Sequence, residues 1–187
     1  MKNIFAKLNL KKTLLELLSI AITLAVIFFL IKIQKNVSEN NNDIDFSKLG
    51  VVRIINIGSG KYLSASNVSD GSQVSQFSKD EGKNQVWQIE KEGNGWSIKL
   101  ANTNSCLEID NGSREDGARS QIWNCLGAPQ QIWQIEKIDK GIYQLHPSYD
   151  GKCLEVNDSS SDEGALTQQW SCAEVMGQRW QIYSALY

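Results

Sequence analysis

The pattern of apolar and polar positions repeats three times in the second part of the chain. One phrase, QVWQIEK, returns as QIWQIEK and, in altered form, as QRWQIYS, at residues 85–91, 131–137 and 178–184. The tryptophans of the three copies, Trp87, Trp133 and Trp180, are 46 and 47 residues apart. This spacing fits one supersecondary unit and is too short for a domain, so it indicates a fold built from three like units.

Each unit has the same four apolar positions. Aligned on the leucine of YLS, CLE and CLE, they are Ile54, Ile98 and Leu145, then Leu63, Leu107 and Leu154, then Phe77, Trp123 and Trp170, and last the three tryptophans above. Between these positions, short segments alternate apolar with polar residues and end at turn signals such as SDGS, EDGA and YDGK. This pattern predicts an all-β fold with about four short strands in each unit.

Units of this size cannot bury both faces of their hairpins alone. We therefore expect about twelve strands around a pseudo-three-fold axis. The predicted domain covers residues 50–187, with repeats at about 50–94, 95–140 and 141–187. The tryptophans of the repeated phrase are expected to form the core, at about 2 to 3 kcal/mol of burial each. The aromatic residue ten positions earlier in each unit has polar neighbours and is expected to be partly exposed.

The composition changes near residue 35. Residues 1–35 carry six lysines and one acid, a net charge of +5, whereas the chain from Gly50 onward carries 12 basic and 17 acidic side chains, a net charge of −5. An acidic domain lacks the clustered positive face that nucleic-acid binding needs, so no nucleic-acid partner is expected. Residues 36–49 are polar and rich in Asn, which predicts a flexible linker.

Residues 17–31 contain no charged side chain. Extended to Leu14 and Ile33, this segment has 20 residues, which at about 1.5 Å each would cover the roughly 30 Å hydrocarbon core of a membrane. Four lysines precede the charge-free stretch and two follow it, so the positive-inside bias places the N-terminus in the cytoplasm. We expect residues 1–35 to be an uncleaved single-pass anchor in the cell membrane, with the domain outside. A cleaved signal peptide, which would release a secreted protein, is the alternative.

Four cysteines lie in the second and third repeats. Cys106 and Cys125, like Cys153 and Cys172, are 19 residues apart and occupy the same places in consecutive repeats, which favours pairing within each repeat over the other two connectivities. A zinc site is the alternative, but the C-x-x-C spacing is absent and the only histidine, His146, stands beside a proline in a predicted turn. Two disulfides would add about 3 kcal/mol each and persist in an oxidising compartment.

The residues around the cysteines resemble a known family. The second repeat reads CLEI, G-x-x-x-QIWNC and QQIW, and the third reads CLEV, G-x-x-x-QQWSC and GQRW. Three Q-x-W phrases at this period, with cysteines in register in two repeats, are similar to those of the ricin B-type lectins, also called carbohydrate-binding module family 13. The resemblance covers about residues 50–187 and implies a β-trefoil fold.

Sugar binding needs groups that replace water around vicinal hydroxyls and a flat apolar surface for the C–H face of the ring. A carboxylate with amides supplies the first, and an indole supplies the second. In the resembled family the carboxylate follows the Cys-hydrophobic pair, and the later phrases supply the amides and the aromatic ring. In the second repeat the resemblance implies a site of Glu108, Gln121, Trp123, Gln130 and Gln131. Here Glu108 stands for the usual Asp, and Gln130 for the usual Asn.

The other two repeats match less well. The third implies a second-ranked site of Glu155, Gln168, Trp170, Gly177 and Gln178, in which the glycine offers no side chain. The first supplies Ser64, Ser75, Phe77, Asn84 and Gln85, with Tyr62 and Lys79 in place of the cysteines. Because it lacks the carboxylate, no sugar site is expected there. An alternative role for Gln85, Gln131 and Gln178 is to satisfy backbone groups and hold the carboxylate without touching a ligand.

Catalysis requires a positioned base, nucleophile or metal. The repeats contain one histidine, no cysteine expected to be free and no distinctive carboxylate pair, so we expect no enzyme activity, no cofactor and no metal. The leading hypothesis is a membrane-anchored lectin that binds glycans, of galactose or xylose type, weakly at each site and gains by avidity. The second hypothesis is a trefoil that has lost sugar binding and recognises an unknown protein.

Overall fold

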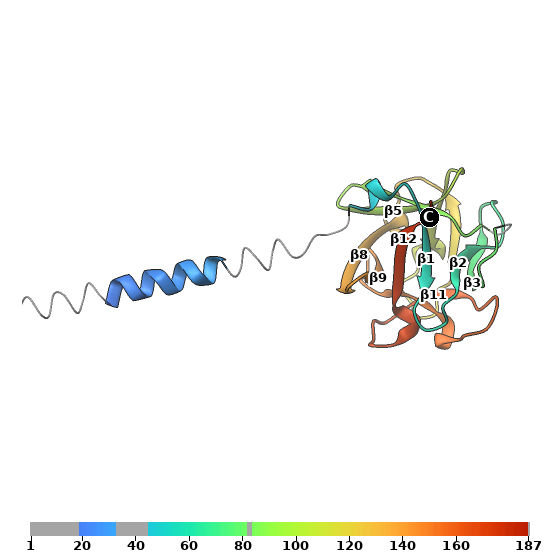
Figure 1. Cartoon of the computed structure of the whole chain (residues 1–187). Helices are drawn as coiled ribbons and strands as arrows, with labels where there is room; N and C mark the ends of the chain where they lie inside the picture. The colour runs from blue at the N-terminus through green and yellow to red at the C-terminus, as the bar shows by residue number, and fades with distance from the viewer. Residues whose placement is uncertain (1–18, 33–44, 82–83, 187) are drawn as a thin grey trace, which may run out of the picture. The chain divides into compact units, whose positions relative to one another are not determined.

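The computed structural model of the protein describes residues 19–32, 45–81 and 84–186 (Figure 1). The chain divides into two compact units, Met1–Ile44 and Asp45–Tyr187. In the first unit, residues 19–32 form an α-helix whose side chains are exposed. Within the described residues, no helix combines the length and the apolar character needed to cross a membrane. Residues 14–18 and 33 of the predicted membrane segment, and residues 36–44 of the predicted linker, lie outside the described residues.

The second unit is all-β, as predicted. In the part of it that the structure describes, each repeat contributes four strands. The first repeat has β1 (Val51–Asn56), β2 (Tyr62–Ala65), β3 (Ser72–Phe77) and β4 (Trp87–Glu92); the second has β5 (Gly95–Leu100), β6 (Ser105–Ile109), β7 (Ser120–Asn124) and β8 (Ile132–Asp139); the third has β9 (Ile142–Pro147), β10 (Cys153–Val156), β11 (Thr167–Trp170) and β12 (Trp180–Ser184).

The first and fourth strands of each repeat form a closed barrel. Their order is β12-β9-β8-β5-β4-β1, and β1 pairs with β12 over five residue pairs, from Val52–Ser184 to Asn56–Trp180, so the sheet returns on itself (Figure 1). Closure leaves no edge strand in the barrel. The second and third strands of each repeat pair as the antiparallel hairpins β2–β3, β6–β7 and β10–β11. Six barrel strands and three hairpins among the described residues make a β-trefoil.

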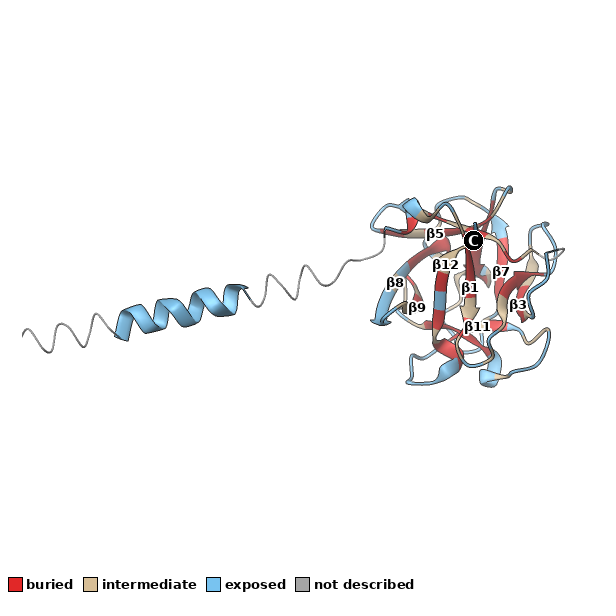
Figure 2. Ribbon diagram, in the orientation of Figure 1, coloured by how far each residue is buried: buried red, intermediate tan, exposed pale blue. Residues whose placement is uncertain are grey.

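The repeated tryptophans join barrel and hairpins. Each lies at the start of the last strand of its repeat and is 0 % exposed, so the predicted core is confirmed. Figure 2 shows buried segments along the strands of the domain and exposed segments mainly in its loops. Each indole Nε1 donates a hydrogen bond to a leucine carbonyl on the first hairpin strand of the same repeat. The pairs are Trp87 to Leu63 at 3.0 Å, Trp133 to Leu107 at 2.9 Å and Trp180 to Leu154 at 2.9 Å. A buried indole N–H needs such an acceptor, so this bond fixes where each hairpin sits on the barrel.

Short 3-10 helices connect the strands. They are η1 (Phe46–Leu49), η2 (Asp110–Gly112), η3 (Pro129–Gln131), η4 (Asn157–Ser159) and η5 (Met176–Gln178). Phe46 of η1 is buried, with its ring edge-on to Trp96 at 5.6 Å and to Tyr143 at 5.3 Å between centroids. The folded unit therefore begins at Asp45, five residues before the predicted start at Gly50. Residues 45–49, predicted as linker, belong to the fold because one aromatic side chain anchors them.

Replacing Trp133 by phenylalanine should lower the free energy of unfolding by about 2 to 4 kcal/mol. The smaller ring leaves a cavity, and the Leu107 carbonyl is left buried without its donor. Urea denaturation followed by circular dichroism measures the loss. Trp123→Phe makes the same change at an exposed ring and should cost less than about 0.5 kcal/mol. Equal losses in the two variants would contradict the role given to the core indole.

Candidate binding site

The β6–β7 hairpin gathers the candidate residues of the second repeat. Side chains alternate along a strand, so Leu107 and Ile109 are buried in the core, whereas Glu108 between them is on the opposite face. Glu108 is paired with Gln121 in the register of the hairpin, and Trp123 is two residues further along β7 on the same face. The phrases CLEI and QIW thus bring an acid, an amide and an indole together, as the resemblance implied.

The Glu108 carboxylate is buried and bound by two amides. Gln121 donates from Nε2 to Oε1 at 2.9 Å, and Gln131 donates from Nε2 to Oε2 at 2.9 Å. Gln121 Nε2 also lies 3.2 Å from Asp110 Oδ1, and Asp110 Oδ2 accepts a hydrogen bond from Arg119 Nε at 2.8 Å. Each carboxylate oxygen has two lone pairs, so the acid is held in place and keeps acceptor capacity for a ligand.

Gln131 supports the site from behind. Its Oε1 accepts the Leu126 N–H at 2.7 Å, and its Nε2 donates to the Asn124 carbonyl at 2.9 Å as well as to Glu108. Both amide hydrogens are thus used within the protein, and the side chain is 1 % exposed. Gln131 holds the carboxylate and the segment after β7, which is the alternative role considered above for this glutamine.

The third repeat builds the same arrangement on the β10–β11 hairpin. Gln168 donates to Glu155 Oε1 at 2.9 Å, and Gln178 donates to Oε2 at 2.7 Å. Gln178 also donates to the Ser171 carbonyl at 3.1 Å and accepts the Ala173 N–H at 2.7 Å. Gln178 is therefore the counterpart of Gln131 in geometry as well as in sequence.

The two candidate indoles are accessible. Trp123 is 40 % exposed and Trp170 is 42 % exposed, in contrast to the three core tryptophans. The partial exposure predicted for these two rings from their polar neighbours is confirmed. An indole presented in this way offers an apolar face to a ligand while the rest of the ring stays packed.

A shallow hollow of about 190 Å³ lies at the second-repeat site. It is lined by Glu108, Asp110, Asn111, Gln121, Trp123, Leu126 and Gln130. Three of these residues, Asp110, Asn111 and Leu126, were not among the predicted site residues. Asp110 lies two positions after Glu108 and therefore on the same side of the chain, so strand alternation could have indicated it. Asn111 has φ +55°, a left-handed conformation that Asn tolerates better than most residues. No sequence pattern singled out Leu126.

The rim residues differ in the third repeat. The positions of Asp110 and Asn111 are taken by Asn157 and Asp158, so the acid and the amide exchange places. Asp158 has φ +53°, which preserves the turn. The residue before the buried glutamine is Gln130 in the second repeat and Gly177 in the third, and Gly177 is buried. The two sites thus share the held carboxylate and the indole but present different polar rims.

A turn from the preceding repeat lies beneath each indole. A Cβ added to Gly71 would be 3.7 Å from Trp123 Cζ3, and one added to Gly117 would be 3.5 Å from Trp170 Cζ3. The acid before each glycine caps the strand beside the indole: Asp70 Oδ1 accepts the Asn124 N–H at 2.7 Å, and Asp116 Oδ1 accepts the Ser171 N–H at 2.8 Å. Both sites are therefore built by two repeats.

The Lys152 side chain also holds Asp116 in place. The Lys152 ammonium donates to Asp116 Oδ1 at 2.6 Å, and this hydrogen bond, with that from Ser171, holds the pKa of the carboxyl below its usual value. The acid stays ionised and keeps its position beside the third-repeat indole.

The first repeat has no carboxylate at the corresponding position. Ser64 and Ser75, which replace the acid and the first amide, are paired across the β2–β3 hairpin and buried. Gln85 keeps its supporting role, because its Nε2 donates to the Ser78 carbonyl at 2.9 Å and its Oε1 accepts the Asp80 N–H at 3.0 Å. The loop geometry is thus retained without the acid.

Both predicted disulfides are formed. Cys106 is bonded to Cys125, and Cys153 to Cys172. Each joins the first hairpin strand to the segment that leads to the supporting glutamine. In the first repeat, where Tyr62 and Lys79 replace the cysteines, Glu81 is bound by Arg53 at 2.7 Å and by Lys79 at 3.1 Å. An ion-pair cluster thus lies where the other repeats have a covalent bond.

The closed barrel with three hairpins places the protein in the β-trefoil class, and two of its hairpins carry a held carboxylate beside an accessible indole. The chain belongs to the ricin-type β-trefoil lectin domain-like family, whose model matches residues 41–123, 83–170 and 129–186. A comparison with curated protein sequences gives no match.

Solved structures share the fold. ThreeFoil, a designed three-fold symmetric protein, has a TM-score of 0.69 and 30% identity over 72% of this chain and 98% of its own. An exo-β-1,3-galactanase from Clostridium thermocellum has a TM-score of 0.69 and 27% identity over 73% of this chain but only 30% of its own. The ricin B-like lectin of Macrolepiota procera, solved in complex with lactose, has a TM-score of 0.62 and 23% identity over 71% of this chain and 94% of its own.

Replacing Gln131 by leucine should destabilise the domain, whereas the same change at its neighbour Gln130 should not. The change removes the acceptor of the Leu126 N–H and leaves one oxygen of the buried Glu108 carboxylate without its donor, at a cost of about 2 to 4 kcal/mol. Gln130→Leu alters only the rim of the hollow and should cost less than about 0.5 kcal/mol. Urea denaturation of the two variants gives both values. A Gln131→Leu variant as stable as Gln130→Leu would show that the buried amide does not support the site.

Proposed function

We propose that the protein is a carbohydrate-binding module whose main site is the hollow of the second repeat, with a related site in the third. The observation that carries the proposal is the Glu108 carboxylate, held by two amides on the same hairpin face as the accessible ring of Trp123. The carboxylate accepts hydrogen bonds from vicinal hydroxyls, and the indole packs against the C–H face of the sugar.

The support around the carboxylate favours recognition of hydroxyl pairs. Gln121 and Gln131 keep Glu108 in one position, so a sugar meets an acceptor that is already ordered. Asp110, at the rim of the same hollow, supplies a second carboxylate, and Gln130 supplies an amide that can donate or accept. A ligand that lacked the hydroxyls would leave these groups without partners, which is the basis of selectivity.

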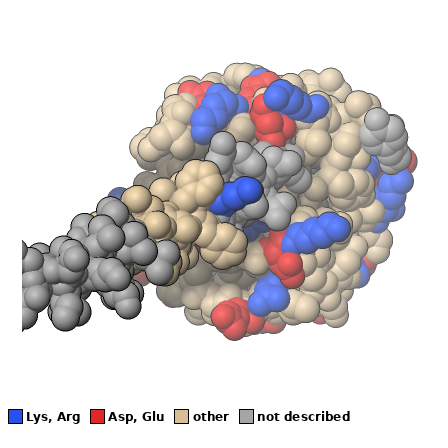
Figure 3. Space-filling model, turned by 60° about the vertical axis from the view of Figure 1, so that its left-hand side comes forward, with Lys and Arg blue, Asp and Glu red and all other residues tan. Residues whose placement is uncertain are grey.

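The proposed ligands are glycans of galactose or xylose type. A monosaccharide has about 12 heavy atoms, and at roughly 0.3 to 0.4 kcal/mol for each the binding free energy is about 4 kcal/mol, near millimolar. Two sites in one chain, and many chains on one membrane, raise the avidity through effective concentration. A nucleic-acid partner is not proposed, because basic side chains stand beside acidic ones on the face in Figure 3.

A second candidate function is protein recognition by a trefoil that has lost sugar binding. Gly177 favours it, because the third repeat then has no amide side chain at the position of Gln130. The two candidates differ in the response of Trp123 and Trp170 to free sugars.

Trp123→Ala should weaken sugar binding at the second repeat by at least about tenfold, because the apolar face of the site is lost. The melting temperature should fall far less than in a variant of a core tryptophan, since the Trp123 ring is 40 % exposed on the outer face of the hairpin. NMR titration of the full chain with galactose, xylose and lactose, up to about 50 mM, measures the affinity near the millimolar range expected. The full chain, with its apolar N-terminal segment, is kept in solution by a detergent. This detergent must carry no glucoside or maltoside group, because such a group would compete with the sugar for the site.

Two matched variants complete the titration. Trp170→Ala should affect the third-repeat site alone, and Phe77→Ala should leave both sites intact. Absence of any sugar response near Trp123 and Trp170 in the wild-type chain would favour protein recognition. A large loss of stability in Trp123→Ala would instead assign that ring to the core.

We further propose that residues 1–35 anchor the protein in the cell membrane with the domain outside. The charge-free stretch 17–31, the lysines on its cytoplasmic side and two disulfides of the kind that persist in oxidising compartments support this location. Secretion after cleavage of the N-terminal segment is the alternative.

Replacing Ile27 and Phe28 by lysine should move the chain from the membrane fraction to the soluble fraction. Each charge near the centre of an apolar helix costs about 2.5 to 3.5 kcal/mol on insertion. Asn40→Lys with Asn41→Lys adds the same charge outside the apolar stretch and should leave the chain with the membrane. Carbonate extraction followed by immunoblotting reads the distribution, and intact mass shows whether the N-terminus is kept. A wild-type chain that is soluble and uncleaved, or one that has lost its N-terminus, would rule out the anchor.

A further inference from the structure

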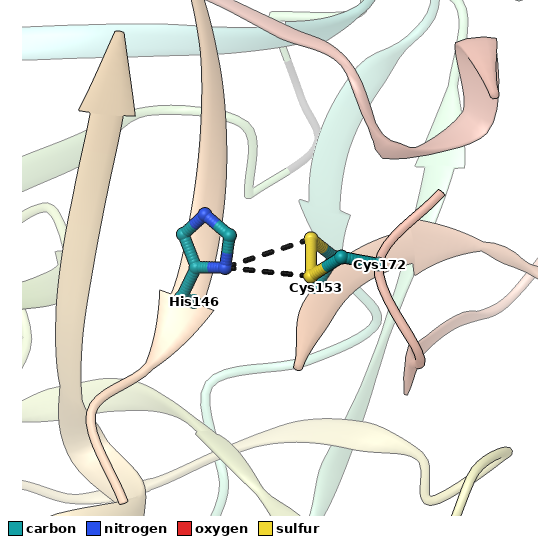
Figure 4. A group of neighbouring side chains, drawn as sticks. All are labelled: His146, Cys153 and Cys172. Atoms are coloured by element: carbon teal, nitrogen blue, oxygen red, sulfur yellow. Dashed lines mark hydrogen bonds between the residues drawn. A yellow bond between two sulfur atoms is a disulfide. The ribbon is translucent and has the colours of Figure 1, made fainter. Parts of the chain in front are cut away.

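The histidine of β9 faces the disulfide of the third repeat. Figure 4 shows the His146 ring directed at the bond between Cys153 and Cys172, and Nδ1 is 3.5 Å from each Sγ. The imidazole nitrogen and both sulfurs lie within 4.8 Å of one another. The sequence offered no reason to bring His146 to this disulfide, because the residue was expected in a turn.

The other nitrogen of the ring faces a carboxylate. Nε2 of His146 is buried, has no hydrogen-bond partner among the described residues and lies 3.4 Å from Glu136 Oε2. The His146 side chain is 13 % exposed. A histidine that binds a metal through one nitrogen commonly presents its other nitrogen to a carboxylate, which fixes the tautomer and the orientation of the ring. The Glu136 carboxylate lies close enough to take this role after a small rotation of the ring.

The second repeat provides an internal comparison. Lys99 has the place of His146, because each follows the buried apolar residue of its strand, and Lys99 pairs with Cys106 in the sheet. Glu90 has the place of Glu136 and lies 4.0 Å from the Lys99 ammonium. Each of the two disulfides therefore has a glutamate at the corresponding position nearby, but the nitrogen beside it carries a lone pair in the third repeat and none in the second. An ammonium group carries three hydrogens and cannot bind a metal.

We propose that His146, Cys153 and Cys172 form a binding site for a thiophilic d¹⁰ cation such as Zn²⁺. The site becomes available when a dithiol reduces the disulfide between the two cysteines. The reductant's two thiols become a disulfide, the S–S bond of the protein breaks, and Cys153 and Cys172 each receive one hydrogen. Zn²⁺ then displaces both thiol protons to solvent and is bound by two thiolates and the Nδ1 lone pair. Two sulfurs and one nitrogen leave a fourth tetrahedral position for water.

The proton on the imidazole has a defined place in both states. Nδ1 lies 3.1 Å from the Lys152 carbonyl, to which it donates in one tautomer while the sulfurs are joined. On metal binding the proton moves to Nε2, where Glu136 accepts it. The exchange requires a change of tautomer and a small rotation of the ring, with no rearrangement of β9.

The cation would take over the structural role of the disulfide. Ser171 and Ala173, on either side of Cys172, bind Gln178, and Gln178 holds the Glu155 carboxylate. A zinc ion shared by Cys153 and Cys172 keeps β10 joined to this segment after reduction. The second repeat has no equivalent ligand and loses its tether under the same conditions.

Zinc uptake by the full chain tests the proposal, in a detergent without thiol or chelating groups. The chain is reduced with excess dithiothreitol, exchanged without oxygen into reductant-free buffer and titrated with zinc chloride. A colorimetric chelator measures bound zinc, and alkylation with mass spectrometry locates the protected cysteines. We expect about one zinc ion per reduced chain and none in the oxidised chain. Cys153 and Cys172 should be protected, whereas Cys106 and Cys125 should be alkylated.

Two variants connect the uptake to the geometry. His146→Lys copies the second repeat and should abolish the protection of Cys153 and Cys172. Glu136→Gln should weaken zinc affinity by about 10-fold or more, while Glu90→Gln, its counterpart in the second repeat, should have no effect. Equal protection of both cysteine pairs, unchanged uptake by His146→Lys, or a reduced chain that takes up no zinc would overturn the proposal. A reduced chain that unfolds and does not refold with zinc would overturn it as well.

Discussion

The hydrogen bond from a buried indole to a leucine carbonyl determines where each hairpin lies on the barrel. Trp133 binds the carbonyl of Leu107, and the next residue of β6 is Glu108. Two residues before Trp133, Gln131 binds the Glu108 carboxylate. One Q-x-W phrase thus holds two neighbouring residues of the hairpin, by the backbone of one and the side chain of the other. Because strand neighbours point to opposite faces, the core contact and the site contact are made by a single segment.

The same reasoning explains why the phrase is repeated in all three units while the carboxylate is not. Gln178 and Trp180 hold Glu155 and Leu154 in the third repeat. In the first repeat Trp87 still binds Leu63, and Gln85 binds the Ser78 carbonyl, the Asp80 N–H and the Arg53 guanidinium instead of a carboxylate. The indole and the glutamine serve folding in every repeat. Under the proposed function the acid serves a ligand, which explains why its loss from the first repeat leaves the fold intact.

Neighbouring repeats are joined by a second recurring contact. Asp70 of the first repeat caps Asn124 of the second, and Asp116 of the second caps Ser171 of the third. Glu163 of the third repeat accepts the N–H of Ser78 in the first at 3.0 Å, which completes the ring. The glycine after each acid brings the turn close to the aromatic ring of the next repeat. A single repeat could not build a complete site, because the surface beneath its ring comes from its neighbour.

Local sequence pattern was sufficient for the parts of the structure that recur at a fixed period. The 46-residue spacing predicted the three repeats, alternation predicted the strands, and the matched positions of the cysteines predicted both disulfides. Contacts that occur once were missed. Phe46 is a single aromatic residue in a polar stretch, and His146 meets Cys172 only because the fold brings β9 to the segment after β11. Neither contact has a periodic signal.

The longer acid at these sites does not weaken the support of the carboxylate. Glutamate adds one methylene to the aspartate usual in the family, yet both oxygens of Glu108 meet their amides at 2.9 Å, and those of Glu155 at 2.9 and 2.7 Å. The scaffold has accommodated the added length in both repeats. Under the proposed function, differences in ligand preference arise at the rim, where Asp110 and Gln130 of the second repeat correspond to Asn157 and Gly177 of the third. Both rims carry one carboxylate, but the rim of the second repeat has one more amide, Gln130, so it can pair with more hydroxyls, and this ranks the second repeat above the third.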